Sequence, residues 1–121
     1  MLGKGIYFSD AAALSLCFCY PKIAGSDILI LLNEVALGNQ NKKPYYDMNA
    51  ANLPKGKHST WGVGTTAPPK SSYMKFEKDI QVPLGKLAPQ KEGGNLGYNE
   101  FVVYDTSQVR MRYLLRCSFN N

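Results

Sequence analysis

Two short stretches of this sequence carry the side chains best suited to chemistry. The first is Gly3-Lys4-Gly5-Ile6-Tyr7-Phe8-Ser9-Asp10, which reads GKGIYFSD. A phosphate-binding glycine loop would continue into a helix, whereas here an apolar and aromatic run follows the second glycine. We therefore interpret the stretch as a turn that brings the backbone close to a neighbouring element, followed by a strand over residues 5–9.

The second stretch is YNEFVVY at residues 98–104, which places Glu100 among aromatic and aliphatic residues. A carboxylate in such surroundings must be solvated, paired or held for a reaction, because an unpaired buried charge is costly. A lone glutamate in a strand is most often a solvated edge residue, so the spacing alone leaves these alternatives open. His58, in a loop rich in lysine and glycine, is more typical of a surface histidine than of a catalytic base.

The elements that would position these residues begin with one helix. Asp10 can cap a helix that runs through residues 11–18 and that Pro21 ends. Ser15 and Phe18 are three residues apart, so they lie on one face of this helix and can share a cleft. The nearly continuous apolar run over residues 28–37 predicts a strand that is buried on both faces.

The rest of the chain favours short strands. Residues 39–78 are expected to be loop with at most short strands such as 60–63, and residues 80–84 an edge strand, because Pro83 interrupts it. Residues 98–104 and 109–119 alternate like strands, and the turn between them predicts a hairpin. Many strands beside one confident helix predict an α+β class that is mostly β.

The bulk properties exclude some functions and disfavour others. The 121 residues suit one domain, and the net charge of +5 is spread along the chain. The hypothesis that the chain is a basic nucleic-acid-binding module is therefore less favoured. The sequence contains no run of 18 apolar residues, so it predicts no membrane-spanning helix. Three cysteines without a CxxC motif, with one histidine, indicate a reducing intracellular compartment and no metal site.

Six blocks together resemble the catalytic domain of poly(ADP-ribose) polymerases, in the order and with the spacing of that family. They run from residue 1 to residue 119, and the resemblance is greatest to the DNA-damage-responsive nuclear members. The blocks are GKGIYFSD, NEVALGN, LPKGKHST, VPLG, YNEF and QVRMRYLL.

This resemblance implies an ADP-ribosyltransferase fold with two packed antiparallel sheets around a cleft for NAD. It implies an enzyme that transfers ADP-ribose from NAD, its substrate, to protein acceptors and to growing poly(ADP-ribose), with release of nicotinamide. No metal and no membrane would be involved. The expected setting is the nucleus and DNA repair, with DNA contacted only through regions outside this chain.

The resemblance also assigns residues. Tyr7 and Glu100 match the tyrosine and glutamate of the family's His-Tyr-Glu triad, and are the expected catalytic residues. Tyr7 and Phe18 would stack on the two faces of nicotinamide, and the Ser15 hydroxyl would accept a hydrogen bond from its amide. Lys4 falls on a lysine beside the cleft, and Gly5 shapes the turn next to it, so both are expected to help bind NAD.

The sequence departs from the family pattern in places. Phe18 stands where tyrosine is usual, and Leu14 where a lysine that faces the acceptor is frequent. The triad histidine and its following glycine belong upstream of Met1. Residues 1–121 are therefore expected to be the C-terminal portion of a catalytic domain, with little or no activity alone. A non-catalytic pseudoenzyme or regulatory fragment of the same fold is the alternative.

Overall fold

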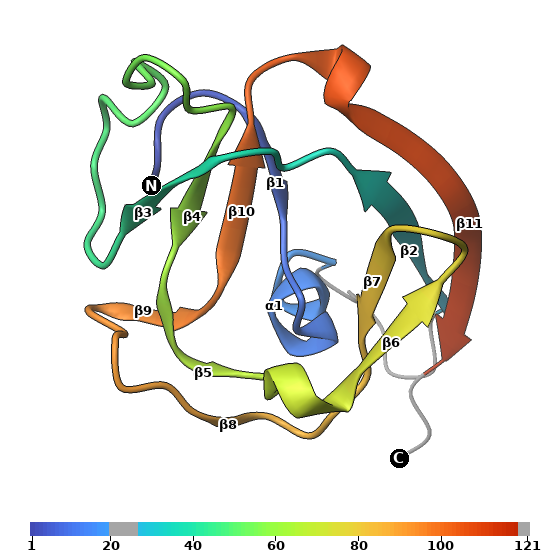
Figure 1. Cartoon of the computed structure of the whole chain (residues 1–121). Coiled ribbons are helices and arrows are strands. Elements are labelled where there is room, and N and C mark those ends of the chain that lie inside the picture. The colour runs from blue at the N-terminus through green and yellow to red at the C-terminus, as the bar shows by residue number, and fades with distance from the viewer. Residues whose placement is uncertain (20–26, 119–121) are drawn as a thin grey trace.

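The computed structural model describes residues 1–19 and 27–118, and this part of the chain is mostly strand (Figure 1). The α+β, mostly β class is thus confirmed. The elements in chain order are β1 (Ile6–Phe8), α1 (Ala12–Cys17), β2 (Asp27–Val35), β3 (Gln40–Lys43), β4 (Ser59–Gly62), β5 (Gly64–Ala67), η1 (Lys70–Ser72), β6 (Tyr73–Phe76), β7 (Ile80–Pro83), β8 (Ala88–Pro89), β9 (Leu96–Tyr98), β10 (Glu100–Val103), η2 (Thr106–Gln108) and β11 (Val109–Ser118).

The central sheet has the strand order β1-β10-β4-β3, with β10 antiparallel to both neighbours and β3 parallel to β4. Tyr7 lies opposite Val102 in the register of β1 and β10. Directly opposed residues share a face of the sheet, and so do residues two apart in one strand. Tyr7 and Glu100 are therefore diagonal neighbours on one face.

A small buried core covers that face. Its members are Leu2, Ala50, Leu96 and Val102, with the partly buried Tyr104 packed against them. The Tyr104 hydroxyl oxygen lies 2.8 Å from the Leu2 carbonyl oxygen and 2.8 Å from the Thr60 hydroxyl. These contacts tie the start of the chain to the sheet.

The glycine turn before β1 is present as expected, and close packing explains one of its glycines. A Cβ atom on Gly5 would lie 2.7 Å from Val102 Cγ1 and 2.8 Å from the Val103 carbonyl oxygen. Real Cβ atoms do not approach backbone so closely, so only glycine lets this segment run against β10. The prediction of a turn that brings the backbone close to another element is confirmed.

The strands β2 and β11 form a separate antiparallel ribbon, which curves at the right of Figure 1. The prediction that β2 is buried on both faces was wrong: Leu29, Leu31 and Leu32 are 61%, 49% and 48% exposed. The apolar run forms a strand, but β11 is its partner and no layer of the described residues covers both faces. The register shifts between Met111 and Tyr113, which makes Arg112 a bulge residue.

The predicted hairpin between residues 98–104 and 109–119 was also wrong. β10 pairs with β1 and β4, whereas β11 pairs with β2. The turn itself was predicted correctly: the Asp105 side chain accepts a hydrogen bond from the Ser107 amide at 2.8 Å. The Gln108 side-chain amide then donates to the Ala36 carbonyl at 2.9 Å, which directs the chain toward β2 instead of back onto β10. Phe119 lies outside the described residues.

Asp10 does not cap α1, contrary to the prediction. The N-cap position is Ala11, which makes no side-chain capping bond. The Asp10 carboxylate instead accepts from Asn99 Nδ2 at 2.8 Å, across the fold, and Ser9 Oγ accepts from the Ala11 amide at 3.1 Å. Pro21, the expected helix terminator, lies outside the described residues.

Two smaller sheets complete the described part of the chain. β5 pairs antiparallel with β8 and parallel with β9, and β6 forms a hairpin with β7, the edge strand predicted from Pro83. More of residues 39–78 is strand than the sequence suggested. No helix in the described ranges is long and apolar enough to cross a membrane.

Candidate active site

A hollow of about 580 Å³ lies where β1 ends, β10 begins and α1 passes beside them. Four of the six residues predicted from the sequence line it, although they come from both ends of the chain. Its lining residues are Met1, Tyr7, Phe8, Ser9, Leu14, Ser15, Phe18, Tyr46 and Glu100.

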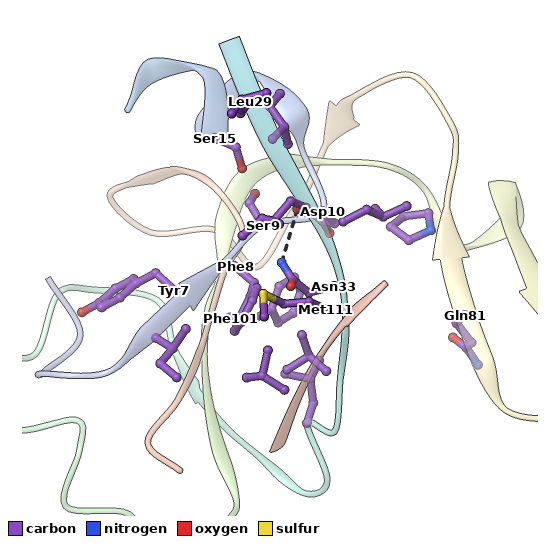
Figure 2. A pocket seen from close by; sticks show the side chains of 18 of the residues that line it. Tyr7, Phe8, Ser9, Asp10, Ser15, Leu29, Asn33, Gln81, Phe101 and Met111 are labelled. Atoms are coloured by element: carbon purple, nitrogen blue, oxygen red, sulfur yellow. Dashed lines mark hydrogen bonds between the residues drawn. The ribbon is translucent and has the colours of Figure 1, made fainter. Parts of the chain in front are cut away.

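Tyr7 presents a ring whose position is fixed by its own hydroxyl. The hydroxyl donates to the Gly3 carbonyl at 2.6 Å and accepts from the Leu2 amide at 2.8 Å. Because these bonds lie at the ring edge, the ring faces remain available, and the residue is 37% exposed. Figure 2 shows a neighbouring hollow that shares Tyr7, Phe8, Ser9 and Ser15, with the Tyr7 side chain directed away from Phe101 and Met111.

The helix α1 supplies the other aromatic wall. Ser15 and Phe18 both line the hollow, as their spacing predicted, and the Phe18 amide donates to the Ser15 carbonyl at 3.1 Å in the last turn. Phe18 is 69% exposed, so its ring is available to contact a ligand. In Figure 2 the Ser15 hydroxyl points from the helix toward the end of β1.

Glu100 is the single carboxylate among the described residues that line this hollow. The described residues make no hydrogen bond to its carboxyl group, and its cross-strand partner is Gly62, which adds no side chain. Burial raises the pKa of Glu100 above its usual value, and the nearby α-ammonium of Met1 partly offsets that rise. A half-buried carboxylate without a hydrogen-bond partner is less screened by water, so it responds to any positive charge that develops beside it.

Asn99, which sequence reasoning missed, anchors the start of β10. Its side chain is buried, at 2% exposure, and Nδ2 donates to Asp10. Its backbone carbonyl accepts from Ser9 Oγ at 2.8 Å. The one signal in the sequence was a polar amide side chain inside the strand predicted over residues 98–104. Three donors converge on its Oδ1 atom: Trp61 Nε1 at 3.0 Å, the Gly64 amide at 3.0 Å and Gln90 Nε2 at 2.9 Å.

The remaining candidates lie elsewhere or play other parts. Lys4 is exposed and is not among the residues that line the hollow, and Gly5 packs against β10. His58 is an exposed loop residue whose Nδ1 accepts from the Asn39 amide at 3.0 Å, as expected of a surface histidine. Tyr46, to which the sequence assigned no role, does line the hollow.

No three His, Cys, Asp or Glu side chains come together as a metal site within residues 1–19 and 27–118. Cys17 and Cys19, close together near α1, are not paired, and neither is Cys117. Among the described residues, the hollow is lined by aromatic rings, hydroxyl groups and one carboxylate.

These features define a mostly β domain with an aromatic pocket built around a glutamate, and comparison with known proteins gives its family. The family model described as the poly(ADP-ribose) polymerase catalytic domain matches residues 1–119. The chain belongs to this family.

Individual relatives are similar in sequence over almost the whole chain. It is 46% identical to poly [ADP-ribose] polymerase 2 of Arabidopsis thaliana over 99% of its length, which is 19% of that protein. It is 45% identical to poly [ADP-ribose] polymerase 1 of Xenopus laevis and 41% identical to poly [ADP-ribose] polymerase 2 of Homo sapiens, again over 99% of the chain. The chain covers 12% and 21% of those two proteins, so it spans about a fifth or less of these relatives.

Proposed function

We propose that this chain supplies the tyrosine and glutamate of an NAD-dependent ADP-ribosyltransferase site. The reaction moves ADP-ribose from NAD to protein acceptors and to growing ADP-ribose chains, and releases nicotinamide. The observation that carries the proposal is the convergence of Tyr7, Ser15, Phe18 and Glu100 on one hollow. These four residues come from both ends of the chain, and their side chains are of the types that this reaction needs.

The aromatic residues would hold the nicotinamide ring. In NAD this ring is a flat cation, and stacking between Tyr7 and Phe18 suits it because aromatic faces are electron-rich. The Ser15 hydroxyl, on the same helix as Phe18, would accept a hydrogen bond from the ring's amide. Phe18 stacks without the hydroxyl that a tyrosine would add.

Glu100 would act on the sugar. The bond between ribose C1′ and the nicotinamide nitrogen breaks with its electron pair leaving on nicotinamide, and positive charge develops on the ribose. A fixed carboxylate stabilises that charge more in the transition state than in the ground state. The same carboxylate can polarise the acceptor hydroxyl, whose oxygen attacks C1′ while its proton passes to that carboxylate.

Lys4 and Gly5 would contribute less directly. Gly5 allows the turn that places Tyr7, and its close contact with β10 supports that part of the proposal. Lys4 lies in the same turn and is exposed, and its ammonium would help to position NAD. We also propose a nuclear setting, by analogy with the DNA-damage-responsive members that the sequence resembles.

The experiment separates the chain from its context. We expect the purified chain, incubated with labelled NAD and histone, to incorporate little label. Residues 1–119 placed in the matching segment of the Arabidopsis thaliana relative should give an active chimera. Glu100→Gln in the chimera should then lower the rate at least about 100-fold, the usual effect of losing one transition-state stabilising group.

Other outcomes have definite meanings. A folded but inactive chimera, or a Glu100→Gln chimera as active as its parent, would overturn the proposed function. A chain that binds NAD in calorimetry, and whose chimera binds it without turnover, would be the non-catalytic member considered from the sequence. Robust labelling by the chain alone would contradict the expectation of low activity.

A further inference from the structure

Tyr46 lines the hollow from a segment that the proposed function does not use. It lies in the loop between β3 and β4, and its side chain is 51% exposed. The preceding residue, Tyr45, is 63% exposed but is not among the lining residues, and its ring edge lies beside Gly94. Two adjacent tyrosines thus differ in whether they face the hollow.

Backbone bonds on both sides hold Tyr46 in place. Directly after it, the Asp47 amide donates to the Met1 carbonyl at 3.1 Å. Two residues before it, the Pro44 carbonyl accepts from the Asn95 amide at 3.1 Å. Because the loop is fixed at both points, the ring is presented to the hollow by a supported backbone and not by a free loop tip.

We propose that Tyr46 is a further aromatic wall of the pocket and a specificity-determining residue, which favours a flat cationic ring over its neutral counterpart. The inference rests on the proposed function. With Tyr46, four aromatic residues line the hollow together with the Glu100 carboxylate, and no Lys or Arg is among the described lining residues. Aromatic faces grouped around one site are the arrangement that recognises quaternary nitrogen cations.

The preference has a use in the reaction. Nicotinamide is a pyridinium cation while it is part of NAD and a neutral molecule once it leaves. A wall that favours the cation holds the substrate more tightly than the released product. Because the ring loses its positive charge as the bond breaks, this contact is stronger in the ground state than in the transition state. Loss of Tyr46 should therefore raise KM and raise kcat slightly.

Two small probes test the inference directly on this chain. 1-Methylnicotinamide carries the positive ring charge and nicotinamide does not, and both titrations can be followed by NMR at millimolar ligand. The chain is used with an acetylated N-terminus, because the Met1 α-ammonium lies near Glu100. The unsubstituted chain should bind the cation more tightly than the neutral ring.

Three substitutions test whether Tyr46 is the source of this preference. Tyr46→Ala should weaken binding of 1-methylnicotinamide by about two- to fivefold and change nicotinamide binding less, as expected for one exposed cation–π contact. Tyr46→Phe should keep the preference, because the ring remains. The matched control, Tyr45→Ala, removes the neighbouring tyrosine ring, which does not line the hollow, and should change neither affinity.

Equal effects of Tyr46→Ala and Tyr45→Ala would overturn the inference. So would a chain that binds both probes without preferring the cation, or that binds neither. The activity of the chimera described above is measured separately. An active chimera with no cation preference in the chain would therefore reject the role of Tyr46 and leave the proposed function standing.

Discussion

At the scale of single residues, the site depends on a carboxylate in surroundings that disfavour its charged form. Glu100 lies among aromatic side chains, with no hydrogen-bond donor from the described residues and with a glycine opposite it. A solvated glutamate would have a lower free energy in its ionised form, but water would screen its charge. The raised pKa is the expected consequence of burial, and it implies a conflict between stability and reactivity at this position.

That conflict predicts a pH-dependent effect of Glu100→Gln on stability. Because the folded-state pKa of Glu100 lies above its unfolded value of 4.5, its contribution to stability is fully present below pH 4.5 and is lost as pH rises through the folded pKa. Glutamine has no such loss. The free energy of unfolding of the variant relative to the parent should therefore increase from pH 4 to pH 7.

Urea unfolding at several pH values measures this difference. A gap between parent and variant that stays constant with pH, or shrinks as pH rises, would show that burial does not govern this carboxyl group. The same variant is expected to lose transferase activity in the chimera, so stability and activity should change in opposite directions at neutral pH.

At the scale of elements, the position of Glu100 is decided by what holds the first residues of β10. Asn99 joins that strand to the segment after β1, to the β4–β5 region and to the segment after β8 through its side-chain amide. The Ser9 hydroxyl adds a bond to its backbone carbonyl. Strand pairing sets the face on which Glu100 lies, and the Asn99 bonds set where the strand begins.

We predict that Asn99→Leu destabilises the chain by about 3 kcal/mol, because it leaves buried donors without an acceptor. Gln90→Leu is the control: it removes one of the three donors to Oδ1 and the bond to the Gly64 carbonyl but leaves Oδ1 satisfied, and should cost about 1 kcal/mol. Urea unfolding of both variants gives the comparison. Equal losses would mean that Asn99 is not the junction between these elements.

At the scale of the whole molecule, the described chain has two parts that differ in how far their apolar side chains are buried. The central sheet has a buried core on one face, whereas the β2–β11 ribbon exposes several large apolar side chains. The β6–β7 hairpin meets the ribbon through Arg112, whose guanidinium bonds Glu77 Oε1 at 2.8 Å and lies 5.7 Å from the Phe76 ring centre. One bulge residue therefore links the ribbon to the hairpin.

We predict that Arg112→Met speeds amide hydrogen exchange in β6 and leaves exchange in β10 unchanged. The ion pair with Glu77 is more than half exposed on the glutamate side, so the effect should be modest, under about 1 kcal/mol of local opening free energy. The control is Arg116→Met, because Arg116 pairs with Asp27 inside the ribbon. Equal exchange rates in β6 for both variants would contradict the link.

The sequence by itself determined the local features of this protein. It predicted the turn and strand around Gly5, the helix that aligns Ser15 with Phe18, and the edge strand with Pro83, because these depend on neighbours within a few residues. The order of its motif blocks also indicated the poly(ADP-ribose) polymerase family. Four of the residues that line the hollow, Tyr7, Ser15, Phe18 and Glu100, could be named from that order, whereas Tyr46 and Asn99 could not.

Only the tertiary structure decided how the pieces meet. Strand alternation states that a segment has two faces but not which strand it pairs with, so the predicted hairpin and the doubly buried β2 were wrong. Asp10 bonds Asn99 instead of capping its own helix, because a partner distant in sequence was closer in space. Tyr46 reaches the pocket for the same reason: contacts between residues far apart in the chain leave no local pattern.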